Sequence, residues 1–419
     1  MGAGNTVAAA RARLEEAGRE LRRRPTGEIL AILGRVLDGW SNPESPWRRE
    51  LAARLPAHTG FSPPTVRKGL AVGLEHWNGS VLEAIVKREM GDPLRLDAAG
   101  STVITGFDHT ACILAGSIPM PTIQALLLPL VLRSPVLAKP ASRDDLTARA
   151  VVESLAETDP GLGGCVEVVD FDSSDEEASA ALLESPCIVA MGSDATLARL
   201  HQKVRPHQRW VGYGHRLSVA IKGAGAPNDA WAERMALDVA LWDQAGCLSP
   251  AAIYVVGDSR DADQSAESLA DALAAAQERW PRGGVATAAS TSIRIERDEA
   301  LVRQGAGHDV RVLGADDSPW TVVREDSATW RSSPLHRFIR IHPVADAGGC
   351  TAALRPLGPH LAAVALDGLE DEAPGFDREL AALGASRIVP AGRLQAPPFD
   401  WHHDGQPLLL PIARFCDRE

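Results

Sequence analysis

One cysteine of this chain stands where covalent chemistry is feasible. Cys247 follows Gly246 and precedes the apolar run 251–256, which we predict to be a buried strand, and a helical pattern ends near Gln244. A thiolate at the head of a central strand, behind a glycine that lets another group approach, is suited to attack a carbonyl carbon. Composition alone favours the plainer interpretation, because isolated cysteines are usually small buried side chains.

Three histidines are candidates for proton transfer: His215, His402 and His403. An imidazole donates or accepts a proton near neutral pH, and Asp404 is placed to orient one of the paired rings. The default interpretation of any one of them is a surface or core histidine. Adjacent histidines also suggest a metal, but no third ligand cluster accompanies them. No CxxC pair occurs among the six cysteines, so we predict neither a metal site nor a disulfide framework.

Length, charge and hydropathy limit the class of protein. With 419 residues, 45% hydrophobic and 23% charged, the chain is expected to be globular with more than one packed unit. A net charge of −12 argues against binding to nucleic acids or to anionic membranes. No apolar run reaches the roughly 20 residues of a membrane span, and the N-terminus lacks the layout of a signal peptide. We therefore expect a cytoplasmic protein.

The pattern of the sequence divides the chain into four parts. Residues 1–98 are predicted to be helical and carry little chemistry. Residues 99–227 alternate short apolar strands with helices, which indicates a parallel sheet that binds ligands at the carboxyl ends of its strands. Residues 228–395 form a second α/β domain that contains Cys247. Residues 396–419 are interpreted as a tail that returns to the active site or to an oligomer interface.

Several motifs, taken in chain order, resemble those of the acyl-CoA (long-chain acyl-protein thioester) reductases, known from the fatty-acid reductase subunit of bacterial bioluminescence. The most specific pieces are the segments 238–250, 212–218 and 401–405, and the region around 59–62 is similar as well. This family is a branch of the aldehyde-dehydrogenase superfamily. The resemblance covers nearly the whole chain and implies two parallel-sheet α/β domains with an N-terminal helical region.

The resemblance also implies where a nicotinamide cofactor binds. Lys139 stands at the strand end that meets the adenosine ribose, and many NAD-preferring relatives carry Glu where Ser142 stands. Ser142 beside Arg143 removes that repulsive carboxylate and adds a cation, which favours NADPH. Gly192 and Ser193 resemble the turn against which the cofactor packs. A lysine at a strand end and a Gly-Ser helix cap are, however, common in proteins of every kind.

Two departures from the superfamily pattern concern the acyl site. Ser117 stands where relatives often carry an Asn that holds the carbonyl oxyanion, so the Ser117 hydroxyl and the Cys247 backbone N–H are expected to share that role, unless the oxyanion hole is built differently. Gly212 stands where aldehyde-oxidising relatives carry the Glu that activates water, and Gly214 follows as an expected cofactor contact. Loss of this general base favours a reductase, because it protects an acyl-enzyme from hydrolysis.

The expected activity is NADPH-dependent reduction of an acyl thioester to a free aldehyde through a Cys247 acyl-enzyme, with the cofactor in the cleft between the two domains. The acyl donor is acyl-CoA, an acyl carrier protein or an acyl-transferring enzyme. One alternative is a CoA-acylating aldehyde dehydrogenase working oxidatively, and another is an acyl-binding scaffold that has lost reduction. Relatives also imply a homo-oligomer, paired through a protruding strand near 330–345 or through the tail.

Overall fold

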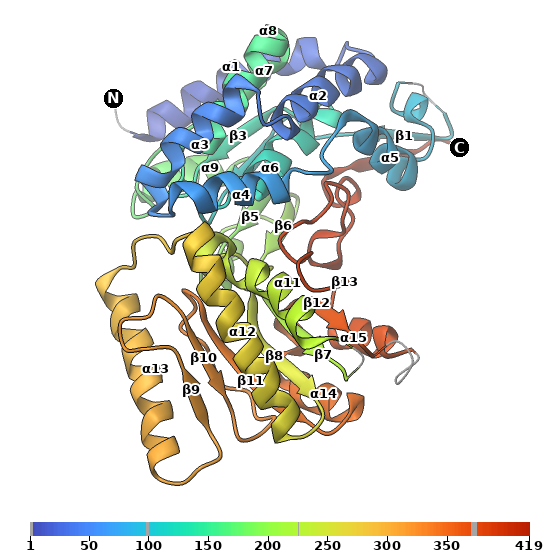
Figure 1. Ribbon diagram of the computed structural model, residues 1–419. Helices are drawn as coiled ribbons and strands as arrows, with labels where there is room; N and C mark the ends of the chain where they lie inside the picture. The colour runs from blue at the N-terminus through green and yellow to red at the C-terminus, as the bar shows by residue number, and fades with distance from the viewer. Residues whose placement is uncertain (1–2, 98–99, 225, 370–374) are drawn as a thin grey trace. The chain divides into compact units, whose positions relative to one another are not determined.

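The computed structural model describes residues 3–97, 100–224, 226–369 and 375–419 (Figure 1). These residues form two compact units. The first unit draws on the residues up to 59, on 74–215 and on 398–419, and the second draws on 60–73 and 216–397. The N-terminal helices and the tail therefore belong mainly to the same unit as the first α/β domain.

Amphipathic helices begin the first unit. In α2, Ile29, Leu33 and Leu37 recur four residues apart and are buried, as expected for a helix with one apolar face. The Trp40 indole N–H donates to the Ser154 hydroxyl at 3.1 Å, which fastens α2 to α7 (Leu146–Thr158). Figure 1 shows α1 and α2 beside α7 and α8 (Pro160–Gly163). The helices of this N-terminal stretch are α1 (Ala3–Leu21), α2 (Thr26–Ser41), α3 (Pro46–Thr59), α5 (Gly79–Met90) and the short η1 (Pro93–Leu96).

The described residues of the first unit contain a parallel sheet in the order β4-β3-β2-β5-β6. The chain moves from β2 to β3 and β4 on one side, and then to β5 and β6 on the other. This reversal beside β2 is where parallel sheets bind ligands. The strands are β2 (Thr110–Ile113), β3 (Val136–Lys139), β4 (Val166–Val168), β5 (Cys187–Met191) and β6 (Arg209–Tyr213). The helices between them are α6 (Pro119–Val131), α7 (Leu146–Thr158), α8 (Pro160–Gly163), α9 (Glu176–Leu183) and α10 (Asp194–His201).

A separate antiparallel ribbon joins β1 (Thr102–Thr105) to β14 (Arg414–Asp417). The first of the short strands expected after residue 99 is β1, and it pairs with the end of the chain rather than with the parallel sheet. All four residues of β14 are exposed. Two short helices precede β14 in the tail, η4 (His403–Gly405) and η5 (Leu410–Ile412).

The described part of the second unit has a larger sheet, in the order β13-β12-β7-β8-β11-β10-β9. Its pairs are parallel except that β9 runs antiparallel to β10. All seven residues of β8 are buried, which agrees with the buried strand predicted after Cys247. The strands are β7 (Leu217–Lys222), β8 (Pro250–Val256), β9 (Arg311–Leu313), β10 (Thr321–Arg324), β11 (Phe338–Val344), β12 (Leu361–Asp367) and β13 (Arg387–Val389).

Helices flank this second sheet, and α12 shows how the sequence starts one. The Asp258 carboxylate accepts the backbone N–H of Asp261 at 3.1 Å, and the Asp261 carboxylate accepts the N–H of Asp258 at 3.0 Å, which is a reciprocal capping box. The helices of the second unit are α4 (Pro63–Gly73), α11 (Asn228–Ala240), η2 (Leu241–Gln244), α12 (Ser259–Arg279), α13 (Thr287–Gly305), α14 (Ala347–Leu354), η3 (Arg355–His360) and α15 (Phe376–Leu383).

One proposed position for a protruding strand is wrong. Residues 338–344 form β11, which pairs with β10 on one side and with β8 on the other. A strand with both edges paired has no free backbone groups for a second copy. The tail remains as the other predicted position.

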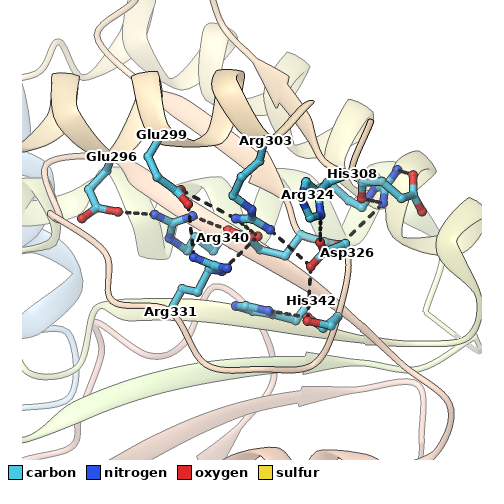
Figure 2. A network of polar contacts seen from close by, with 12 residues as sticks. Glu296, Glu299, Arg303, His308, Arg324, Asp326, Arg331, Arg340 and His342 are labelled. Carbon is cyan, nitrogen blue, oxygen red and sulfur yellow. Dashed lines mark hydrogen bonds and ion pairs between the residues drawn. The ribbon is translucent and has the colours of Figure 1, made fainter. Parts of the chain in front are cut away.

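A network of charged side chains ties α13 to β10 and β11, and we call it the α13 network (Figure 2). Glu325, 1% exposed, bonds Arg340 and also accepts from Arg303 at 2.8 Å. Arg324 pairs with Asp263 at 2.6 Å. Its members are Asp263, Glu296, Glu299, Arg303, Asp309, Arg324, Glu325, Asp326, Arg331 and Arg340.

None of the helices described here is both long enough and apolar enough to cross a bilayer.

Candidate active site

Cys247 lies in the turn between η2 and β8, and its side chain is half-buried. The Ser218 hydroxyl, at the start of β7, donates to the Cys247 carbonyl oxygen at 2.7 Å. The same hydroxyl accepts the backbone N–H of Ala363 on β12 at 3.2 Å. The backbone of the cysteine is thus fixed to two neighbouring strands, at the amino end of the sheet.

The remaining cysteines are less suited to nucleophilic attack. Cys112, Cys165, Cys187 and Cys350 are buried. Burial disfavours the thiolate: it raises the pKa of Cys165 to about 11 and those of Cys187 and Cys350 to about 12, and the pKa of Cys112 also rises. Cys416 is exposed on β14, away from any central strand.

The residues just before Cys247 form a strained run that sequence reasoning missed. Trp242, Asp243 and Gln244 have φ of 55°, 48° and 61°. Side chains other than glycine rarely adopt this left-handed region, and such strain gathers at functional sites. The Asp243 carboxylate is buried against the Arg337 guanidinium. Because the run contains no glycine, its sequence does not indicate a left-handed conformation.

Lys139 is the last residue of β3, and its side chain is half-buried at the carboxyl edge of the first sheet. Its ammonium lies 3.3 Å from the Ser173 hydroxyl and 5.1 Å from the Phe171 ring centroid. Burial lowers the pKa of Lys139, while the nearby charges of Asp170 and Asp172 act to raise it. These carboxylates, which sequence reasoning missed, oppose a 2′-phosphate, so Lys139 is better suited to ribose hydroxyls.

Ser142 and Arg143 are both exposed in the turn after β3. Among the described residues, Arg143 has neither a hydrogen bond nor an ion pair. The turn is stabilised by Asp144, whose carboxylate accepts the N–H of Thr147 at 3.0 Å and its hydroxyl at 2.6 Å. Arg143 is therefore a cation at the end of β3, in reach of solvent and fit for a phosphate.

Four predicted site residues lie just after the carboxyl ends of β5 and β6: Gly192, Ser193, Gly214 and His215. Ser193 caps α10, with its hydroxyl accepting the N–H of Thr196 at 3.3 Å. A Cβ at Gly214 would lie 2.5 Å from Asp194 Oδ1, which explains the glycine. His215 is exposed and its backbone N–H donates to the Asp194 carboxylate at 2.8 Å.

Asp194 also bears on whether the N-terminus of α10 can bind a phosphate group. Helix N-termini attract anions through their free N–H groups, but the first turn of α10 already carries this carboxylate. The Gly-Ser motif alone gives no indication of this competition.

The tail brings one of the paired histidines to the end of β6. The His403 ring stacks on Tyr213, with centroids 4.5 Å apart, and on Trp401 at 5.0 Å. Asp404 Oδ1 lies 4.0 Å from His403 Nε2, which is beyond hydrogen-bond range. His403 is buried while His402 is exposed. Stacking, more than Asp404, orients the His403 ring.

Glu89 of α5 anchors this tail, and sequence reasoning missed it. Its carboxylate accepts the backbone N–H groups of Leu408, Leu409 and Leu410 at 2.9, 2.7 and 3.1 Å. Gln124 adds a bond of 2.7 Å to the Phe399 carbonyl. Glu89 and Leu409 lie 320 residues apart in the chain, and Gln124 and Phe399 lie 275 apart, so no local sequence pattern predicts either contact.

The predicted site residues thus fall into two groups. The first unit gathers Ser117 after β2, the cofactor candidates after β3, β5 and β6, and the histidines. The second unit carries Cys247. The shared oxyanion role of Ser117 and Cys247 therefore stays a prediction. Within the described ranges, no group of three or more His, Cys, Asp or Glu is arranged to hold a metal ion.

Comparisons with known structures show the fold. The chain is similar to an NAD-dependent benzaldehyde dehydrogenase from Corynebacterium glutamicum, with a TM-score of 0.72 and 16% sequence identity. It is also similar to an oxidoreductase from Marinobacter aquaeolei, with a TM-score of 0.76 and 14% identity. Each match covers 99% of this chain and 90% of the other. The predicted architecture, that of the aldehyde dehydrogenases, is confirmed.

Comparisons of sequence show the family. The long-chain acyl-protein thioester reductase of Aliivibrio fischeri is 22% identical over 94% of this chain and 82% of its own length. The long-chain acyl-protein thioester reductase of Photobacterium phosphoreum is also 22% identical, over 94% of this chain and 80% of its own length. The profile of a family described as acyl-CoA reductase (LuxC) matches residues 21–415. The predictions of a thioester reductase and of a nicotinamide cofactor are confirmed at the level of the family. This chain belongs to the acyl-CoA reductase (LuxC) family.

Proposed function

We propose that this chain reduces the acyl group of a thioester to a free aldehyde, with NADPH as reductant and Cys247 as the residue that carries the acyl group. The observation that carries the proposal is the position of Cys247, half-buried at the head of the buried strand β8 and fixed by Ser218. Family membership and the reductases among its relatives support the reaction.

The residues after β3 fit an NADPH molecule. Lys139 would donate to the ribose hydroxyls and Arg143 would hold a 2′-phosphate, with Ser142 beside it as a neutral donor. Gly192, Ser193 and Gly214 would form the close backbone surface against the rest of the cofactor. Bound NADPH would supply the hydride that converts the thioester carbonyl to an aldehyde. Because these residues belong to the first unit and Cys247 to the second, the reaction requires both units.

The first chemical step belongs to the protein. The Cys247 thiolate attacks the donor's carbonyl carbon and forms a new C–S bond, and the C–S bond to the donor breaks. The donor's sulfur leaves as a thiolate and takes the proton that the Cys247 thiol gave up when it ionised. The backbone N–H of Cys247 and the Ser117 hydroxyl would stabilise the oxyanion. His215, His402 or His403 would provide the proton that the Cys247 sulfur takes up as the aldehyde leaves.

Gly212 would leave the acyl-enzyme protected from hydrolysis, because glycine has no side chain that could act as a general base. A general base at this position would activate water and release a carboxylic acid. Gly212 lies on β6, and a Cβ there would come within 3.0 Å of the Trp210 indole nitrogen. The position has little room for a longer side chain without movement of Trp210, which supports reduction over oxidation to an acid.

The proposal also covers the acyl donor, the oligomeric state and the cellular compartment. The donor is acyl-CoA, an acyl carrier protein or an acyl-transferring enzyme. A homo-oligomer would form through the exposed ribbon that ends in β14. The six cysteines form no disulfide, which suits the reducing cytoplasm.

The test is acyl labelling of Cys247→Ala, with Cys416→Ala as the matched control. Each protein is incubated with a radioactive long-chain acyl-CoA, and label and NADPH consumption are measured. We expect Cys247→Ala to lose both and Cys416→Ala to keep both. Label retained by Cys247→Ala would remove Cys247 from its role.

The wild-type protein separates the alternatives. A CoA-acylating dehydrogenase would form acyl-CoA faster from aldehyde, CoA and NADP⁺ than it consumes acyl-CoA with NADPH. A scaffold that has lost reduction would take up label and leave it in place when NADPH is added.

A further inference from the structure

Two strained backbone runs face each other in the second unit. One is the run 242–244 that leads into the Cys247 turn. The other is Leu335, His336 and Arg337, with φ of 64°, 56° and 68°, which leads into β11. Three left-handed residues in succession persist only where surrounding contacts hold them. Since β8 and β11 are paired neighbours, the two runs enter adjacent strands.

A buried ion pair joins these runs. Arg337 Nε donates to Asp243 Oδ1 at 2.8 Å, and Nη2 lies 2.7 Å from the same oxygen. The side chains are 1% and 6% exposed. Asp243 Oδ2 accepts the backbone N–H of Gly283 at 2.9 Å. Arg337 also donates to the Gln277 side chain at 2.9 Å and to the Ala240 carbonyl at 3.1 Å.

The neighbours of Asp243 are fixed as well. The Trp242 ring packs against Gly69 of α4, where a Cβ would come within 2.3 Å of it, and against Phe61 with ring centroids 5.4 Å apart. The Gln244 amide donates to the Pro250 carbonyl at 2.9 Å, across the turn that contains Cys247. Cys247 therefore follows a backbone segment that is strained and is held by contacts on several sides.

We propose that Asp243 and Arg337 are positioning residues for Cys247, whose ion pair keeps residues 242–244 left-handed and so fixes the direction of the thiol toward an acyl donor. The inference rests on the proposed function. Stability alone does not account for the pair, because a buried ion pair is often no more stabilising than apolar residues of the same size. A pair that bridges two strained runs beside a nucleophile instead sets a geometry.

The experiment uses Arg337→Met, Arg337→Lys and Asp243→Asn in the full-length protein. Glu325→Gln is the matched control, because Glu325 is also a buried carboxylate paired with arginine in the same unit. For each protein we would measure single-turnover acylation of Cys247 by long-chain acyl-CoA, and alkylation of the Cys247 peptide by iodoacetamide across pH. Melting curves give the fraction folded.

We expect Arg337→Met to slow acylation about 10- to 100-fold per folded molecule, since small misplacements of reacting groups have effects of this size. KM for acyl-CoA should change less than kcat, and the pH profile of alkylation should shift. Arg337→Lys, which keeps the charge but loses the planar contact, should be intermediate. Asp243→Asn should resemble Arg337→Met, and Glu325→Gln should acylate at the wild-type rate.

Wild-type acylation rates in folded Arg337→Met and Asp243→Asn would overturn the positioning role and leave the proposed function intact. If the wild-type protein takes no label at Cys247, the proposed function fails, and alkylation still tests the positioning role, because it needs neither acyl donor nor cofactor. An unchanged alkylation profile would then overturn it. Should Arg337→Met not fold, Arg337→Lys decides by the same criteria.

Discussion

The Asp243–Arg337 pair and the α13 network are both buried and charged, and both lie in the second unit, but they differ in what they hold. The α13 network joins a helix to regular strands, and its arginines share several carboxylates (Figure 2). The Asp243–Arg337 pair joins two left-handed runs, one of which ends three residues before Cys247. Under our two proposals, burial of charge serves packing in one region and the geometry of the proposed nucleophile Cys247 in the other.

The largest effect on stability should come from Glu325→Gln. Glu325 is almost fully buried between Arg340 and Arg303, and loss of its charge leaves two guanidinium groups without their shared partner. Breaking a buried ion pair costs about 3–5 kcal/mol. Urea unfolding should show this loss. If acylation by folded Glu325→Gln falls as far as that by Arg337→Met, the proposed difference between the two regions is wrong.

Gly69→Ala should have a smaller effect on stability but a clear one on activity. The added methyl group meets the Trp242 ring at 2.3 Å, and overpacking of this kind costs about 1–3 kcal/mol. Displacing Trp242 disturbs the run before Cys247, so acylation per folded molecule should fall. Gly305→Ala is the control, since no atom lies within 4 Å of its added Cβ. Equal acylation rates in the two variants would contradict this.

The smallest effect concerns pH. Burial lowers the pKa of His342, which lies beside the α13 network with Nδ1 2.9 Å from the Ser327 carbonyl. Below about pH 6.5 the unfolded chain takes up a proton that folded His342 binds only at lower pH, so stability falls on acidification. Unfolding of His342→Gln from pH 7 to 5 should show a weaker slope, with acylation unchanged. An identical slope would remove His342 as the cause.

Local patterns predicted the parts of the site that follow from local chemistry. The apolar run after Cys247 had to be a buried strand, and strand–helix alternation placed Lys139, Gly192 and Ser193 at the carboxyl ends of parallel strands. The motif 212–218 runs from the end of β6 into the start of β7, and neither strand was predicted from the sequence.

The contacts that hold the site were not predictable in the same way. Arg337 and Asp243 lie 94 residues apart, and left-handed φ values in Trp242 and Gln244 follow from tertiary contacts rather than from their own preferences. The carboxylates of Asp170 and Asp172 likewise affect Lys139 only once β3 and β4 lie next to each other.

The most direct test of the account is a pulse and chase on the wild-type protein. Long-chain acyl-CoA is added without reductant, the acylated peptide is identified by mass spectrometry, and NADPH is then supplied. We predict an acyl adduct on the Cys247 peptide that disappears on addition of NADPH as an equal amount of free aldehyde forms. An adduct on another residue, or one on Cys247 that NADPH leaves untouched, would contradict it.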